Sequence, residues 1–197
     1  MADVAQLEGE ITQAFADRAV ADAVLLGASG EWYDENGARH TYADPEVSAA
    51  HHFFLGKRWS EVSGPPLLSW PQASSSLIFL EPEVAAAYLP AYMITTLRYP
   101  HEGVTILEGV VAWLARPAEV LAGRGSGAAA LQTGRPAQAA AMRANELLRF
   151  DRFLGELSER KQQLIARFLE HAAEVLEIDG LDNRARSALD LFWGRFL

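Results

Sequence analysis

The chain has 197 residues, which is enough for one domain with a substantial hydrophobic core. Half of its residues are hydrophobic and 22% are charged, a globular composition that argues against a disordered or fibrous chain. Because the sequence contains no cysteine, it excludes disulfides, thiol nucleophiles, zinc fingers and iron–sulfur clusters. The formal net charge of −9 argues against a nucleic-acid partner, since binding to phosphates needs a basic surface.

The acidic charge is concentrated near the N-terminus. Residues 1–44 contain nine acidic and two basic side chains, whereas the remaining 153 residues contain 17 acidic and 15 basic ones. Residues 116–167 are locally basic, with nine basic and five acidic side chains. We expect these two segments to attract each other, either within one chain or between two copies. The alternative is that the acidic segment recruits a basic protein partner.

No export signal or membrane segment is predicted. The first ten residues contain three acidic side chains and no basic one, the reverse of a secretory signal. The apolar run Val84–Leu97 has 14 residues, fewer than the roughly 20 that cross a bilayer. We therefore expect a cytoplasmic protein without a membrane partner.

Helical periodicity dominates the first half of the sequence. Apolar residues at spacings of three and four predict a helix over about 4–26. Glycine, asparagine and aspartate accumulate over 27–44 and predict a long loop. A helix is expected over about 45–56, because Asp44 suits its N-cap and Pro45 its first position.

The middle of the chain is rich in proline. Residues 60–76 contain three prolines and many serines, which predicts no regular element. A helix is expected over 82–98, interrupted at Pro90, and another over 104–116. Alanine and glycine dominate residues 118–141, which predicts a loop or an insertion.

The C-terminal part has the clearest helical pattern. A helix is expected to resume near Pro136 and reach Phe150, and two apolar stripes follow over 164–176 and 185–196. No strand pattern longer than four residues is apparent. The prediction is an all-α fold: one compact domain over residues 1–197, with six or seven helices and one helix kinked or broken at Pro90.

Three blocks of sequence carry a resemblance to known proteins. They are FLGKRW at 54–59, LIFLEPE at 77–83 and YLPAYM at 88–93. The chain resembles an uncharacterised family of bacterial domains of unknown function at these blocks, and the stripe at 168–169 and the end at 188–194 are similar to the same family. The resemblance implies a bacterial cytosolic protein and brings no activity, cofactor or catalytic residue with it.

The sequence predicts no metal site, no cofactor and no catalytic residue. His51 and His52 are adjacent, so on a helix they project about 100° apart and cannot hold one ion together. A relaxed dinucleotide fingerprint occurs at 123–128, but no strand precedes it. Nucleophile and phosphate-loop motifs are absent. Whether the protein is an enzyme stays open.

Pro90 is the most unusual local feature. In a straight helix it cannot donate a hydrogen bond to the Ala86 carbonyl, which costs about 3 kcal/mol unless the chain kinks. Tyr88 and Tyr92 flank it at a spacing of four residues and therefore share a helix face. The two hydroxyls beside a freed carbonyl suggest a polar pocket; the alternative is a kink that serves packing.

Three functional hypotheses follow. The first is a non-enzymatic protein–protein interaction module, of immunity or adaptor type, that binds a basic protein or a second copy of itself, with the five tryptophans as possible anchors. The second is a small-ligand-binding protein or an enzyme with a pocket near Tyr88 and Tyr92. The third is a structural domain of a larger assembly. The candidate binding residues are Trp59, Glu83, Tyr88, Tyr92 and Arg98.

Overall fold

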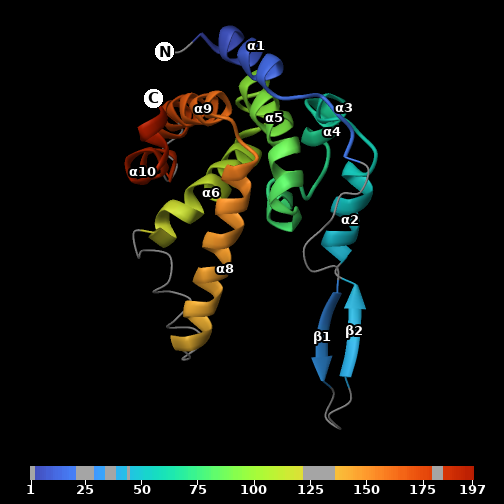
Figure 1. The fold of residues 1–197 in the computed structure, drawn as a ribbon. Coiled ribbons are helices and arrows are strands. Elements are labelled where there is room, and N and C mark those ends of the chain that lie inside the picture. Colours follow the sequence, from blue (N-terminus) through green and yellow to red (C-terminus); the bar gives the residue numbers. More distant parts are fainter. Residues whose placement is uncertain (1–2, 21–28, 34–38, 44, 122–135, 179–183) are drawn as a thin grey trace.

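The computed structural model describes most of the chain. The backbone is described over residues 3–20, 29–33, 39–43, 45–121, 136–178 and 184–197. Side chains are described over residues 3–20, 45–115, 144–178 and 184–197. In this part the protein is an all-α domain with one two-stranded hairpin, which confirms the predicted fold class (Figure 1).

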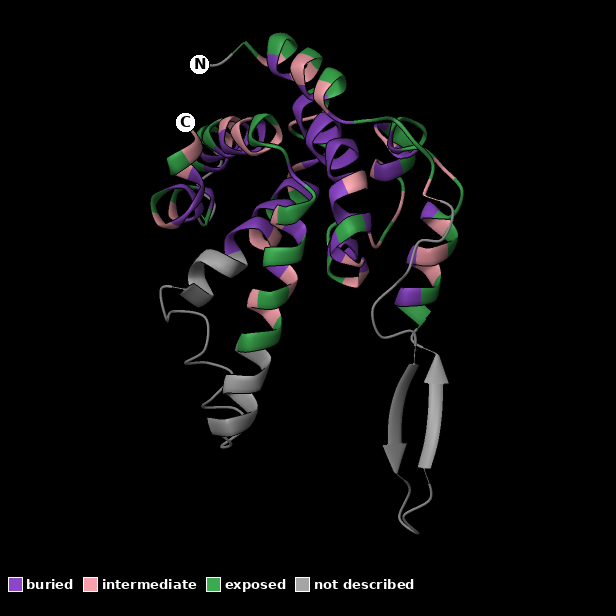
Figure 2. Cartoon of the chain, in the orientation of Figure 1, coloured by how far each residue is buried: buried purple, intermediate pink, exposed green. Residues whose placement is uncertain are grey.

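Helix α5 (Pro82–Arg98) lies at the centre of the molecule, with other helices around it (Figure 1). Fourteen of its 17 residues are buried, as expected for a helix that is apolar on all sides (Figure 2). The helix is continuous through Pro90, so it is not broken there. Thr95 links it to a neighbouring loop, because its hydroxyl oxygen accepts a hydrogen bond of 2.7 Å from the Gly64 N–H.

The N-terminal helix α1 (Val4–Ala14) is shorter than predicted. It begins where Asp3 accepts hydrogen bonds from the first turn, and its buried face includes Leu7 and Ile11. The helix predicted to reach residue 26 ends at Ala14, and residues 15–20 are not helical. Tertiary contacts override the helical pattern here, because the next residues turn to pack and hydrogen-bond against other elements.

Two strands replace the loop that was expected over residues 27–44. Strands β1 (Ser29–Tyr33) and β2 (Arg39–Ala43) pair in antiparallel fashion, with Glu31 opposite Thr41. Asn36 and Gly37, which contributed to the loop prediction, fall between the two strands in the sequence, and the strands themselves contain aromatic residues and a threonine, which favour sheets. The hairpin extends from the end of α2 (Pro45–Phe54), away from the other helices (Figure 1).

Two short helices occur where no regular element was predicted. They are α3 (Trp59–Val62) and α4 (Pro65–Leu68), and a 3₁₀ turn, η1 (Ser76–Phe79), follows them. Pro65 and Pro66 occupy the first turn of α4, where the missing N–H groups have no helical partner to lose. These two helices raise the number in the described residues to nine, above the predicted six or seven.

A loop was expected over residues 118–141, but helices α6 (Val104–Leu121) and α8 (Pro136–Gly155) extend into this range from both sides. Helix α6 continues through Pro117 instead of ending there, and α8 begins at Pro136. Residues 122–135 of the expected loop lie outside the described residues. Within α6, Gly109 approaches the Ser74 carbonyl so closely that a β-carbon would overlap it.

The C-terminal stripes form helices, as predicted. They are α9 (Glu159–Ile178) and α10 (Arg184–Leu191), followed by the 3₁₀ turn η2 (Trp193–Phe196). The fully buried Trp193 donates its indole N–H to the Leu114 carbonyl at 3.1 Å, which fastens this end to α6. Among the described helices, none is both long and apolar enough to cross a membrane.

Some of the acidic side chains near the N-terminus form ion pairs within the chain. Glu10 on α1 binds both Arg160 and Arg167 on α9. Glu8 binds Arg98 at the end of α5. The attraction expected between the acidic segment and the basic middle is therefore partly realised inside one chain.

Candidate functional site

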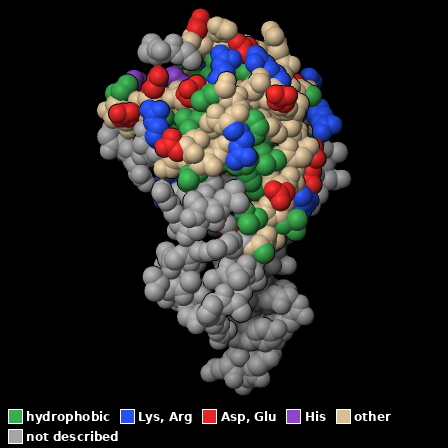
Figure 3. Space-filling model, turned by 60° about the vertical axis from the view of Figure 1, so that its left-hand side comes forward, with side chains coloured by type: hydrophobic (Ala, Val, Ile, Leu, Met, Phe, Trp, Pro, Cys, Tyr) green, Lys and Arg blue, Asp and Glu red, His purple; other side chains and the backbone are tan. Residues whose placement is uncertain are grey.

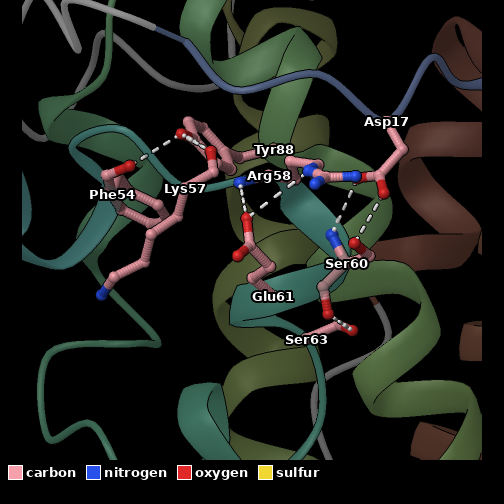
Figure 4. A network of polar contacts seen from close by, with 8 residues as sticks. All are labelled: Asp17, Phe54, Lys57, Arg58, Ser60, Glu61, Ser63 and Tyr88. Atoms are coloured by element: carbon pink, nitrogen blue, oxygen red, sulfur yellow. Dashed lines mark hydrogen bonds and ion pairs between the residues drawn. The ribbon is translucent and has the colours of Figure 1, made fainter.

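The hydroxyl of Tyr88 is bound by the protein's own backbone. It lies 2.8 Å from the Phe54 carbonyl oxygen and 2.7 Å from that of Lys57, and donates to both (Figure 4). The loop turns back to present these carbonyls at Gly56, whose φ of 70° favours glycine. Burial raises the pKa of the Tyr88 phenol, and a backbone hydrogen bond with Val20 partly offsets this.

Tyr92 is also closed off from solvent. The side chain is completely buried, and its hydroxyl contacts that of Ser76. Because Ser76 donates its own proton to the Ala73 carbonyl at 2.9 Å, Tyr92 is the donor to Ser76. Burial raises the pKa of Tyr92. Both predicted pocket hydroxyls thus have partners inside the fold.

The other three candidate residues have different structural roles and do not lie together. Trp59 is only 4% exposed, so its ring packs in the core. Glu83 binds Arg152 at 2.7 Å, and this hydrogen bond lowers the pKa of Glu83. Arg98 binds Glu8. Since Glu83 and Arg98 stand at opposite ends of α5, roughly 22 Å apart along its axis, the structure does not gather the five residues into one site.

A polar network near Tyr88 fastens the segment after α1 to helix α3 (Figure 4). The carboxylate of Asp17 accepts hydrogen bonds from the Ser60 N–H at 3.2 Å and the Ser60 hydroxyl at 2.6 Å. Glu61 accepts the Arg58 N–H at 2.7 Å. The Glu61 contact caps α3 itself, whereas the two Asp17 contacts join the segment after α1 to α3 and help to explain why residues 15–20 leave the helix.

A groove with aromatic walls lies where the start of α5 meets α6 and α8. It encloses a cavity of about 60 Å³. Trp113 and Phe153 meet edge to face in its wall, with ring centres 4.7 Å apart, and Phe150 lies beside them. Ile78 and Pro82 complete the apolar lining, and Ile78 is 39% exposed.

Charged side chains of both signs border this groove. Glu146 and Arg149 line it, and Arg149 donates to the Leu80 carbonyl at 3.1 Å. Nearby, Arg152 bridges Glu81 at 3.3 Å and Glu83 at 2.7 Å. A mixed pattern of hydrophobic side chains among basic and acidic ones is also visible on the face shown in Figure 3. An apolar centre with a charged border is the usual composition of a protein-binding surface.

Sequence reasoning missed this groove. Trp113, Phe150 and Phe153 fall on apolar helix faces, which predicts only that they are core residues. The available signal was the spacing of Phe150 and Phe153, which places both on one face of α8. Phe150 and Phe153 are indeed buried, but their position beside a groove depends on how α6 and α8 cross, and no local pattern encodes that crossing.

A second, more polar depression lies between α6 and the C-terminal helices. Its volume is about 370 Å³, and Ser74, Thr105, Glu108 and Arg184 contribute polar groups to its lining. Within the described side chains, no group of three histidine, aspartate or glutamate residues is arranged to hold a metal ion.

Comparison of the chain with protein-family models, curated proteins and solved structures found no match. The resemblance to a family of uncharacterised bacterial domains remains a prediction. Function has to be inferred from the geometry of the molecule itself.

Proposed function

We propose that the protein is a non-enzymatic interaction module, of immunity or adaptor type, that acts in the bacterial cytoplasm. The partner is a protein that inserts an apolar side chain into the aromatic groove. The observation that carries this proposal is the groove itself, with Trp113, Phe150 and Phe153 in its walls and the partly exposed Ile78 at its edge. Aromatic pockets of this kind hold the side chains that dominate the energy of protein interfaces.

The size of the groove favours a protein partner over a small molecule. A cavity of about 60 Å³ has room for one apolar side chain. Small-molecule sites are usually larger, about 300–1,000 Å³, and enclose most of their ligand. The alternative pocket at Tyr88 and Tyr92 has less support, because both hydroxyls already bind groups of the chain.

Charge supports a basic partner. Of the nine acidic residues in the N-terminal 44, Asp3 caps α1, while Glu8, Glu10 and Asp17 bind side chains within the fold. The other five fall within residues 21–44, together with the single base Arg39. This segment therefore has a net charge of −4, which favours the approach of a basic protein.

The proposal is tested by comparing Ile78→Asp with Leu148→Asp. Both residues are exposed and apolar, at 39% and 61%, but only Ile78 lines the groove. We expect wild type and Leu148→Asp to retain the same co-purifying protein from a bacterial cytosol, and Ile78→Asp to lose it. Retention by all three, with circular dichroism showing equal folding, would contradict a role for the groove.

A further inference from the structure

We propose that strand β2 pairs with strand β2 of a second copy, forming a four-stranded sheet across a two-fold axis. The proposal is independent of the aromatic groove, which lies on other elements. In the part of the chain that the structure describes, β1 and β2 belong to a sheet of only these two strands. A two-stranded hairpin is marginally stable by itself in water, and additional strands stabilise it.

The hairpin lies apart from the helices around α5 (Figure 1). Figure 1 shows both strands extending from the end of α2, away from the helices around α5. An open edge presents backbone N–H and C=O groups that can pair with another strand. Identical strands related by a two-fold axis run antiparallel, which is the pairing that this hairpin already uses.

The sequence of β2 suits pairing with itself. The register that pairs all five of its residues is centred on Thr41, so Thr41 would stand opposite Thr41 of the second copy. His40 would stand opposite Tyr42, and Arg39 opposite Ala43. No two like charges meet in this register, and threonine pairs across antiparallel strands are favourable.

The sequence of β1 disfavours the same arrangement. Its central residue is Glu31, so a two-fold axis on this edge would place two carboxylates directly opposite each other. A basic foreign strand would prefer the β1 edge for the same reason, because β2 carries Arg39 and no acidic residue. The distribution of charge therefore favours the β2 edge over the β1 edge for pairing between two copies of this chain.

A single introduced thiol tests the arrangement, because the chain has no cysteine of its own. Residues opposite each other in antiparallel strands have α-carbons about 4.5–5.5 Å apart, within the range that a disulfide bridges. We expect Thr41→Cys in the full chain to form a disulfide-linked dimer under mild oxidation, at least about tenfold faster than Glu31→Cys. Glu31 is the matched control because it stands opposite Thr41 within the hairpin.

Exchange of charges provides a second measurement by sedimentation velocity. We expect the wild type to be a dimer, Thr41→Glu and Thr41→Lys each to be monomers, and an equimolar mixture of the two variants to dimerise again. A monomeric wild type, a dimer that persists in both variants, or faster crosslinking of Glu31→Cys would overturn the proposal. These results do not depend on Ile78, so failure here and failure of the groove are distinguishable.

Discussion

Two aromatic regions lie on different sides of helix α5, and they differ in what closes them. Tyr88 and Tyr92 carry hydroxyls that need partners when buried, and carbonyl or hydroxyl groups of neighbouring segments supply them. The rings of Phe150 and Phe153 have no polar atom; they are buried against each other and against Trp113, and they line one side of the aromatic groove. The comparison teaches that hydrogen bonds within the fold close the polar aromatic region, whereas the apolar one is held by contacts between rings and borders a groove.

The largest expected effect is on the closed region. Tyr92→Ala removes a completely buried ring and should lower the free energy of unfolding by about 3–5 kcal/mol, as for other buried aromatic residues. Denaturant titration measures this loss. A change below about 1 kcal/mol would show that the ring is not part of the core and would remove the contrast between the two regions.

A smaller effect is expected from Tyr88→Phe, which removes the hydroxyl and keeps the ring. The carbonyls of Phe54 and Lys57 then lose their hydrogen-bond donor, which should cost about 1–3 kcal/mol. Partner binding, corrected for the unfolded fraction, should be unchanged. If binding falls more than stability does, the hydroxyl contributes to a site and the ligand-pocket hypothesis gains support.

The smallest effect concerns Glu83 beside the groove. The hydrogen bond from Arg152 lowers its pKa below the ordinary 4.5, so this pair contributes stability above that pH and loses it as the pH falls through the lowered value. Glu83→Gln should therefore weaken the dependence of stability on pH in the acid range. The free energy of unfolding of wild type and variant, measured at neutral and at acid pH, tests this expectation, with Glu156→Gln as an exposed control. Equal acid dependence in wild type and Glu83→Gln would show that the pair contributes nothing.

Acid should leave the charge of the two buried tyrosines unaffected. Burial raises the pKa of both Tyr88 and Tyr92, so neither phenol changes its charge between neutral and acid pH.

The helices whose positions depend on short-range sequence patterns were predicted correctly. The apolar stripes of α9 and α10 follow the helical period, and Pro82 occupies the first position of α5. These three helices could therefore be predicted from the sequence. The end of α1 could not be predicted, because Asp17 lies beyond the helix and binds Ser60, which is 43 residues away in the sequence. The hairpin was hidden by the glycine and asparagine that join its strands.

The candidate site was less predictable than the fold. The sequence drew attention to Tyr88 and Tyr92, but the groups that bind Tyr88 lie 31 and 34 residues away, and nothing in the spacing reveals them. The walls of the groove come from α6 and α8, whose apolar residues resemble any other core. A site that forms where two helices cross can be identified only when the geometry of the crossing is known.

The link between α1 and α9 has a consequence for synthesis of the protein. Glu10 binds Arg160 and Arg167, which are 150 and 157 residues later in the chain. At about 5–20 residues per second, a ribosome needs roughly 8–30 s to make the second half of this contact after the first. During that interval Leu7 and Ile11, both buried in the finished fold, lack the surface of α9. Helix α1 can pack on α5 soon after residue 98 has been made, but it gains its contacts with α9 only after residues 160–167 have followed.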